Sequence, residues 1–254
     1  MPPPTQYIDI GDIDAPVCRV FSNSRIKQTL SNRLLSLVSP AKWDDPFENF
    51  LAKTLAHLTR SGHTISLGGV FRNIFGQCWT TLPTESDAMW RIYSHDKEGV
   101  RVKSSPRKLL SAIYDTTHPF REMSFFIGKV QYASEAEIKA WFQDAAFSAS
   151  IVLDQSGRNQ AQALLLKRLE FQHEQEVRLL YKFCADGYSG DLPTDAFHFP
   201  IDPNAVFDEM LFDPRMDADV FRRNAEEVRH LGYRGPVDRS RLYQLPDFQI
   251  NVDA

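Results

Sequence analysis

The chain is organised around one stretch, which reads Leu169-Glu170-Phe171-Gln172-His173-Glu174-Gln175-Glu176-Val177-Arg178-Leu179-Leu180-Tyr181. From Glu174 onward two kinds of residue alternate: a charged set of Glu174, Glu176 and Arg178, and an apolar set of Val177, Leu179 and Tyr181. A β-strand sends alternate side chains to opposite faces. The pattern therefore predicts a strand with its charged set on one face.

The charged face is a candidate site. Two carboxylates held close together raise one another's pKa, while a neighbouring arginine keeps at least one of them ionised. Glu174 and Glu176, with Arg178 beside them, therefore suit catalysis or the binding of sugar hydroxyls. The alternative is a half-exposed strand whose solvent face carries a Glu and Arg ladder.

Composition restricts the class of protein. The 254 residues are 43% hydrophobic and 24% charged, which is typical of a soluble globular chain. A net charge of −4 gives no overall attraction to nucleic acid.

The three cysteines are far apart in apolar surroundings, so we interpret them as buried thiols and not as disulfide partners or zinc ligands. Neither a signal-peptide pattern nor an apolar run of membrane-spanning length is seen, so a cytoplasmic location without a membrane partner is expected.

Periodicity and capping residues predict an α+β fold. Strands are expected at 17–21, 33–38, within 71–81, and at 99–103, 125–132, 206–212 and 235–242. Helices are expected at 47–60, 85–93, 106–114, 135–149, 158–170 and 217–231. Residues 1–15 hold three prolines and an acidic segment, and they predict a poorly ordered lead-in with a short edge strand. Residues 16–254 are expected to form a single domain with a mixed or antiparallel sheet flanked by helices. The sheet is expected to be either continuous or split into two parts.

Several common motifs are missing from the sequence. It has no glycine-rich phosphate loop, dinucleotide fingerprint, serine elbow or paired-histidine zinc helix, and nothing indicates a metal site. Basic residues gather at 101–108 and 222–241, and a toxin acting on nucleic acid would need these two groups to converge. Because the second group is interleaved with acidic residues, a salt-bridged surface is the stronger interpretation.

Taken in order, several stretches resemble a bacterial family known as domain of unknown function 2971. The pieces that carry the resemblance are Trp43-Asp44-Asp45-Pro46-Phe47-Glu48, Gln77-Cys78-Trp79-Thr80, Met89-Trp90 with Tyr93 and Gly99-Val100, Glu174-Gln175-Glu176-Val177-Arg178, and Ser240-Arg241-Leu242-Tyr243. The chain departs from the family pattern at Asp44, at Trp79-Thr80 and at Ile92, where members usually carry Asn, a Phe-Ser pair and His. The resemblance marks positions and implies no established reaction.

Arg19 on the first strand, the hydroxyl-ended strand Cys78-Trp79-Thr80-Thr81 and the late Glu174-Gln175-Glu176 are similar to the Arg, Ser-Thr-Ser and Glu-x-Glu order of the ADP-ribosyltransferases. That resemblance implies that Arg19 anchors the phosphates of NAD, that Thr80 supports the nicotinamide side of the pocket, that Glu174 orients the substrate and that Glu176 is catalytic. Glu176 would bind a ribose hydroxyl and stabilise an oxocarbenium-like transition state. Trp79 stands where a small residue is expected.

Together these features predict a nucleotide-sized pocket with NAD as the substrate. The candidate cofactor-binding residues are Arg19, Trp79, Thr80, Trp90 and Tyr93, and the candidates for the rest of the substrate are Asp44, Asp45, Phe47 and Glu48. Helix capping explains the acidic residues equally well, and core packing the aromatic ones. The expected activity is ADP-ribosyl transfer or NAD hydrolysis of a bacterial defence or toxin type, with any macromolecular target unknown. The alternative is a non-catalytic nucleotide-binding sensor or effector module of a stress or phage-defence system.

Overall fold

The computed structural model describes residues 1–43, 45, 55–57, 64–66, 71, 73–184 and 195–246. Within these ranges the strands are β1 (Tyr7–Ile8), β2 (Val17–Phe21), β3 (Leu34–Val38), β4 (Leu55–His57), β5 (Thr64–Ser66), β6 (Ile74–Thr80), β7 (Val100–Ser104), β8 (Phe125–Lys129), β9 (Gln131–Ala133), β10 (Leu166–Arg168), β11 (Glu176–Lys182), β12 (Ala196–Pro200), β13 (Glu209–Phe212) and β14 (Val237–Arg239). Ten of them form one mixed sheet in the order β1-β8-β11-β6-β2-β7-β13-β14, with β3 joined to β6 and β12 joined to β3. The small pairs are β9 with β10 and β4 with β5. This arrangement confirms the α+β fold class.

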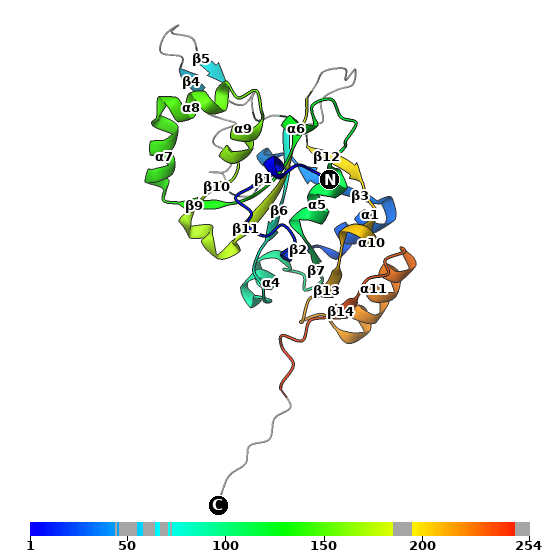
Figure 1. Cartoon of the computed structure of the whole chain (residues 1–254). Coiled ribbons are helices and arrows are strands. Elements are labelled where there is room, and N and C mark those ends of the chain that lie inside the picture. Colours follow the sequence, from blue (N-terminus) through cyan, green and yellow to red (C-terminus); the bar gives the residue numbers. More distant parts are fainter. Residues whose placement is uncertain are drawn as a thin grey trace, which may run out of the picture.

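Helices lie on both sides of the large sheet (Figure 1). In the described residues they are α1 (Asn23–Asn32), α4 (Asp87–Tyr93), α5 (Pro106–Ile113), α6 (Arg121–Ser124), α7 (Glu135–Gln143), α8 (Ala145–Val152), α9 (Arg158–Ala163), α10 (Pro203–Val206) and α11 (Ala218–His230), with 3-10 turns η1 (Pro4–Gln6), η2 (Pro40–Lys42) and η3 (Leu169–Glu174). One apolar core includes residues of α1 and α5, and a second includes residues of α8 and α9. The sheet thus separates two cores.

Strand β11 shows why the sheet has two different faces. Val177, Leu179 and Tyr181 pack into the first core, while Leu180 packs into the second. Glu176 and Arg178 share the parity of Leu180, and they are only 5% and 1% exposed. The predicted alternation is confirmed from Glu176 onward, but Glu174 lies in the 3-10 turn η3 and not on the strand. The half-exposed ladder is wrong because the charged face is covered by protein.

Most of the predicted elements are present with shifted ends. Strand β2 matches its predicted range, and α7 begins where the helix at 135–149 was expected, with Ser134 and Glu137 forming a capping box. The helix expected at 135–149 is divided at Asp144, whose side chain accepts a hydrogen bond from Phe147 N–H and so begins α8. Local capping residues therefore decide where these helices start.

Two predicted helices need correction. The helix expected at 158–170 ends at Ala163, and the next residues form β10, which pairs in parallel with β9. Lys167 was expected near the end of that helix and is instead a strand residue. The helix expected at 47–60 is wrong at Leu55–His57, which is strand β4; its remaining residues lie outside the described ranges.

The N-terminal segment is part of the sheet, although a poorly ordered lead-in was expected. Strand β1 pairs in parallel with β8 at the edge of the sheet, and Ile8 is fully buried in the second core. Gln6 donates a hydrogen bond to the Glu122 carbonyl oxygen. Both contacts hold residues 4–8 against the domain.

The sheet divides at β6, which has different partners at its two ends. Gly76 pairs with Val38 of β3, and Thr80 pairs with Cys18 of β2. Cys78 lies between these pairings, and its carbonyl oxygen accepts a hydrogen bond from Arg19 Nη1. A guanidinium group thus occupies the place where a continuous sheet would supply a strand partner.

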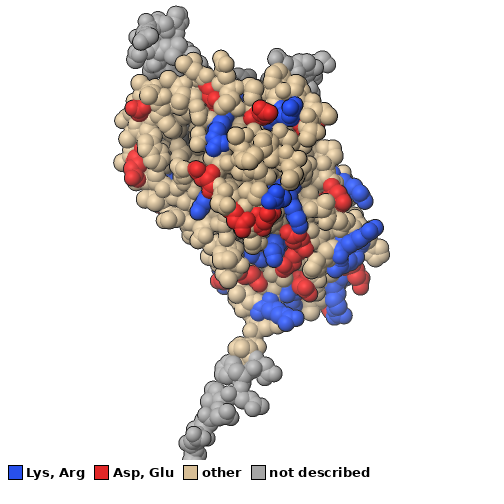
Figure 2. Space-filling view, in the orientation of Figure 1, with Lys and Arg blue, Asp and Glu red and all other residues tan. Residues whose placement is uncertain are grey.

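Positive and negative side chains are interspersed on the face shown in Figure 2. Within the two basic groups noted in the sequence, Lys103 pairs with Glu209, Lys108 with Asp208 and Arg222 with Asp219. The Arg222 pair agrees with the salt-bridged interpretation of the second group, and the pairs of Lys103 and Lys108 show that the first group is partly paired as well. Among the described residues no helix is long and apolar enough to cross a membrane.

Substituting Gly76 by Ala is predicted to destabilise the domain. A Cβ atom at this position would lie 2.8 Å from Trp43 Cζ2 and 3.0 Å from Leu180 Cδ2, which is closer than packed atoms allow. We expect a loss of about 1–3 kcal/mol in the free energy of unfolding, measured by denaturant titration. Gly11→Ala is the matched control, since a Cβ there meets no atom within 4 Å. Equal stability of the two variants would contradict the packing described here.

Candidate functional site

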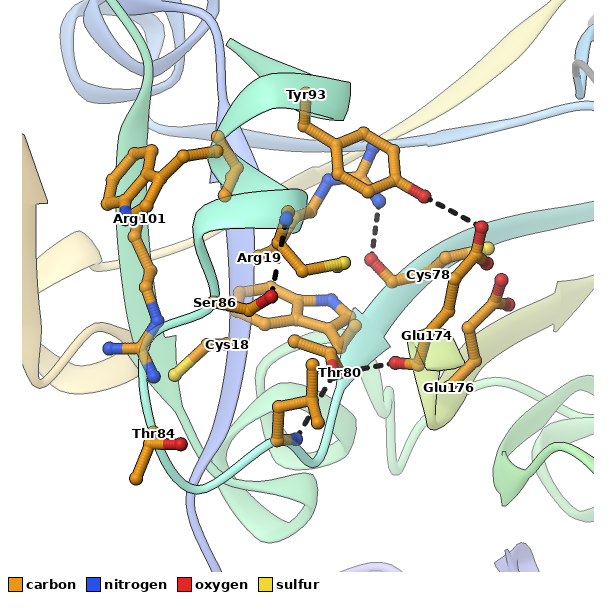
Figure 3. A pocket seen from close by; sticks show the side chains of 15 residues that line it. Cys18, Arg19, Cys78, Thr80, Thr84, Ser86, Tyr93, Arg101, Glu174 and Glu176 are labelled. Atoms are coloured by element: carbon orange, nitrogen blue, oxygen red, sulfur yellow. Dashed lines mark hydrogen bonds between the residues drawn. The ribbon is translucent and has the colours of Figure 1, made fainter. Parts of the chain in front are cut away.

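A pocket opens beside the division in the sheet (Figure 3). It is walled by strands β2, β6 and β7, by the segment 82–86, by helix α4 and by the end of η3 with the start of β11. The lining residues are Cys18, Arg19, Val20, Cys78, Trp79, Thr80, Leu82, Thr84, Ser86, Met89, Trp90, Tyr93, Arg101, Glu174 and Glu176.

The structure brings Arg19, Thr80 and Glu176 to one pocket. They lie on β2, β6 and β11, which are consecutive strands in the sheet. Glu176 is opposite Thr80 in the ladder, and Thr80 is opposite Cys18, the neighbour of Arg19. The sheet register therefore produces an arrangement that the sequence order alone did not determine.

Two buried glutamates share one lysine at this site. Lys167 Nζ lies 2.6 Å from Glu174 Oε2 and 2.5 Å from Glu176 Oε1. All three residues are less than 8% exposed. Burial without partners would cost each charge several kcal/mol, so the lysine is what allows two carboxylates to lie together here.

Arg178 completes the buried network from outside the pocket. Its Nε donates to Glu176 Oε2 at 2.7 Å, and its Nη1 donates to the Leu164 carbonyl oxygen at 2.6 Å. Its guanidinium also stacks on the Trp43 ring, 4.5 Å from the centroid. Arg178 does not line the pocket, so it acts by positioning Glu176; it was expected among the catalytic residues themselves.

The pKa values of the two glutamates are shifted in opposite directions. Burial, together with a hydrogen bond shared with Glu176, raises the pKa of Glu174 to about 7 against the opposing effect of Lys167. Burial also acts to raise the pKa of Glu176, but the charge of Arg178 and the contacts with Glu174 and Lys167 outweigh it and hold that pKa well below the usual range. Glu176 is therefore the ionised carboxylate and Glu174 the one that exchanges a proton near neutral pH.

Hydrogen bonds hold Glu174 at the pocket wall. Tyr93 donates its hydroxyl proton to Glu174 Oε1 at 3.1 Å, and Thr80 Oγ1 donates to the Glu174 carbonyl oxygen at 2.6 Å. Thr80 Oγ1 also accepts from Leu82 N–H. Gln175 follows in the left-handed region at φ 44°, and this turn brings Glu174 back beside Glu176. The Thr80 hydroxyl thus orients the glutamate turn.

The two tryptophans form the pocket's apolar walls and belong to the protein interior. Trp79 is 2% exposed, packs edge-on against Phe21, and donates its Nε1–H to Gln77 Oε1 at 2.9 Å. Trp90 is 1% exposed and donates its Nε1–H to Glu85 Oε2 at 3.0 Å. Because both side chains are buried and both indole N–H groups already have acceptors, the two tryptophans agree with the core-packing alternative.

Helix α4 is held in place by the closing motif of the chain. Ser240 Oγ donates to the same Glu85 carboxylate that binds Trp90, and the Tyr243 hydroxyl donates to Asp87. Ile92, the position where the resembled family usually has His, is exposed on α4 and is not among the lining residues.

The proposed substrate group at 44–48 is placed only in part. Asp45 is 7% exposed and pairs with Arg168 at 2.9 Å; it does not line the pocket. Asp44, Phe47 and Glu48 lie outside the described residues. Among the described residues, no three His, Cys, Asp or Glu side chains are grouped so that they could hold a metal ion.

Sequence reasoning missed four residues of this site. Lys167 was assigned to a helix end, Arg101 to a basic surface patch, and Cys18 and Cys78 to buried thiols without a role. Only Lys167 left a usable signal, since it lies within ten residues of both glutamates and cannot be buried without them. The other three depend on strand register between distant segments.

Comparisons with known proteins agree with part of the resemblance. The family model described as "Protein of unknown function (DUF2971)" matches residues 89–179. That stretch runs from Met89 of α4 to Leu179 of β11 and so includes Arg101, Lys167 and both glutamates. It covers less than half of the chain, and β2 and β6 lie outside it. No curated protein matches the chain.

Three solved structures of DarT from Thermus sp. 2.9 show a distant likeness. The complex with ADP-ribosylated ssDNA has a TM-score of 0.41 and 13% identity, covering 89% of this chain and 94% of that one. The complex with NAD+ has a TM-score of 0.40 and 12% identity, covering 90% and 96%. The complex with carba-NAD+ has a TM-score of 0.38 and 13% identity, covering 90% and 97%. At this level of likeness, function has to be argued from the site's own geometry.

The opposite pKa shifts predict a characteristic dependence of stability on pH. The folded state keeps a proton on Glu174 that the unfolded chain releases near its ordinary pKa of 4.5. Stability contributed by this group is fully present below pH 4.5 and is lost as the pH rises through about 7, by about 3 kcal/mol at most. Glu176 acts in the opposite direction, because its lowered pKa makes stability fall as the pH drops below 4.5.

Glu174→Gln tests this assignment, since it removes the titrating proton while keeping the side chain's shape. Unfolding free energies measured from pH 4.5 to 8 are expected to decline in the wild type and to stay flat over that range in the variant. An unchanged slope in Glu174→Gln would show that another group titrates.

Removing the bridging lysine is predicted to be costly. Lys167→Met leaves two buried carboxylates without their shared partner, so we expect a loss of about 3–5 kcal/mol in the free energy of unfolding. Lys139→Met is the matched control, because Lys139 forms an exposed ion pair with Glu135 and its loss should cost less than about 1 kcal/mol. Similar losses in both variants would contradict the buried network.

Proposed function

We propose that this chain is an ADP-ribosyltransferase-like enzyme that cleaves NAD, either transferring ADP-ribose or hydrolysing the dinucleotide. The observation that carries the proposal is that Arg19, Thr80 and Glu176 line one pocket from three neighbouring strands. This is the grouping that the similarity to ADP-ribosyltransferases requires. A packed core between these residues would have ruled out the proposal.

The charges of the pocket suit each end of NAD. Arg19 lines the pocket and uses one of its five N–H donors for the Cys78 carbonyl oxygen, so its guanidinium retains donor capacity for a phosphate oxygen. The glutamate pair lines the wall formed by the end of η3 and the start of β11, where a ribose hydroxyl would donate to Glu176. The carboxylate of Glu176 accepts one bond on each oxygen from Lys167 and Arg178, and each oxygen has a second lone pair for the ribose.

The proposed reaction breaks the bond between ribose C1′ and the nicotinamide nitrogen. The bonding electron pair leaves with the nitrogen, which turns the positively charged pyridinium into neutral nicotinamide. Positive charge develops on the ribose, and the ionised Glu176 stabilises it. A nucleophilic oxygen or nitrogen of water or of an acceptor then bonds to C1′ and releases a proton, which Glu174 accepts in its ionised form. No oxidation or reduction takes place.

The buried network has a defined part in this scheme. Lys167 and Arg178 keep Glu176 ionised despite its burial, so its charge is present before the substrate enters. Tyr93 and Thr80 hold Glu174 beside it. A bacterial defence or toxin role, and the identity of any macromolecular acceptor, belong to the same proposal.

The test is release of nicotinamide from NAD by wild-type protein and by Glu176→Gln. We expect the variant to keep its circular dichroism spectrum and to lose at least about 10²-fold in rate, because it lacks the charge that stabilises the transition state. Glu176→Asp keeps the negative charge, but its shorter side chain holds the carboxylate farther from the ribose. We therefore expect this variant to release nicotinamide more slowly than the wild type as well. Glu135→Gln, on the exposed face of α7, is the control and should match the wild type.

The outcomes separate the two functions. An active Glu176→Gln protein would remove that residue from the mechanism. Saturable NAD binding by the wild type without nicotinamide release would favour a non-catalytic nucleotide-binding module. If neither binding nor release is detected, NAD is not the ligand of this pocket.

A further inference from the structure

The pocket has two arginines, and only one of them belongs to the resemblance. Arg101 lies on β7, the strand next to β2, and its ladder partner there is Val20. Figure 3 shows its guanidinium toward Cys18 and Thr84, with Glu174 and Glu176 on the opposite side of the pocket. The pocket is therefore basic at one end and acidic at the other.

Arg101 differs from its basic neighbours in having no acidic partner. Along the same face of β7, Lys103 pairs with Glu209, and in the following helix Lys108 pairs with Asp208. Among the described residues the Arg101 side chain forms no ion pair or hydrogen bond, and the residue is only partly exposed. A guanidinium kept partly out of water without a counter-ion is ready to bind an anion.

Arg19 has the same property on the adjacent strand. Its one hydrogen bond in the described structure goes to the Cys78 carbonyl oxygen, and its Nε is buried without a partner. Neither arginine forms an ion pair among the described residues, and Figure 3 shows the Arg19 guanidinium beside Cys78, nearer the glutamates than Arg101 is. Two positive charges without counter-ions match a group that carries two negative charges better than one that carries a single charge.

We propose that Arg101 is a second anion-binding residue, and that with Arg19 it selects ligands carrying a diphosphate. This inference rests on the proposed function for the orientation of the ligand, with its ribose at the glutamates and its diphosphate between the arginines. It makes a further statement that the proposed function does not: nucleosides without phosphates bind more weakly than ligands with a diphosphate, and Arg101 is responsible for part of this difference in affinity. The neutral hydroxyls of Thr84 and Ser86 line the same region and can accept or donate hydrogen bonds to the phosphates.

The test measures binding of ADP-ribose, inorganic pyrophosphate and adenosine by calorimetry to the full chain. We expect Arg101→Gln to weaken ADP-ribose binding by about 10-fold or more, which is the loss of one charge-assisted hydrogen bond, and to leave adenosine binding unchanged. Arg101→Lys retains the charge and should recover part of the affinity. Arg222→Gln is the control, because Arg222 is exposed and paired with Asp219 on α11.

Each result points to one conclusion. If Arg101→Gln binds ADP-ribose as tightly as both the wild type and the control Arg222→Gln, then Arg101 is not an anion-binding residue, even if the wild type releases nicotinamide. If Arg101→Gln loses diphosphate binding while the wild type releases no nicotinamide, the anion site stands and the enzymatic proposal fails. If wild-type protein binds neither ADP-ribose nor pyrophosphate, both are wrong. Unfolding temperatures of the variants identify any loss that arises from misfolding.

Discussion

The site depends on a buried lysine that neutralises two glutamates. Lys167 contacts both carboxylates at 2.5–2.6 Å, and Arg178 binds the second of them from behind. Four charged side chains that are this deeply buried require partners on all sides, since breaking such a network costs several kcal/mol. The requirement fixes the relative positions of β10, η3 and β11. It therefore places Glu176 at the pocket wall as an ionised group before any ligand arrives.

The division of the sheet at β6 provides the space that the charged network faces. One end of β6 pairs with β3 and the other with β2, so the carbonyl group of Cys78 is left between two strands. Arg19 satisfies that carbonyl and in doing so brings a positive charge to the pocket. The same irregularity that interrupts the ladder therefore positions the arginine that we propose to bind phosphate. Helix α4, fastened by Ser240 and Tyr243, covers the opening with Tyr93 and Trp90.

Sequence reasoning reached the local features of this molecule and missed the non-local ones. The alternation in β11, the strand at Val17–Phe21 and the Ser134 capping box each depend on residues within a few positions of one another. Lys167 was misplaced because its strand β10 has only three residues and follows a helical segment directly. Arg101, Cys18 and Cys78 come to the pocket through strand pairings between segments about 60 to 80 residues apart, which a single sequence does not specify. Arg19, Thr80 and the two glutamates could therefore be named from the sequence, while the second arginine required the fold.

The central claim is that one pocket holds NAD with its nicotinamide ribose at Glu176 and its phosphates at the arginine end. A crystal structure of the chain with a non-cleavable NAD analogue tests this most directly. We expect a ribose hydroxyl within hydrogen-bonding distance of the Glu176 carboxylate and a phosphate oxygen within the same distance of the Arg19 guanidinium. An analogue bound outside this pocket, or one with its phosphates beside the glutamates, would contradict it.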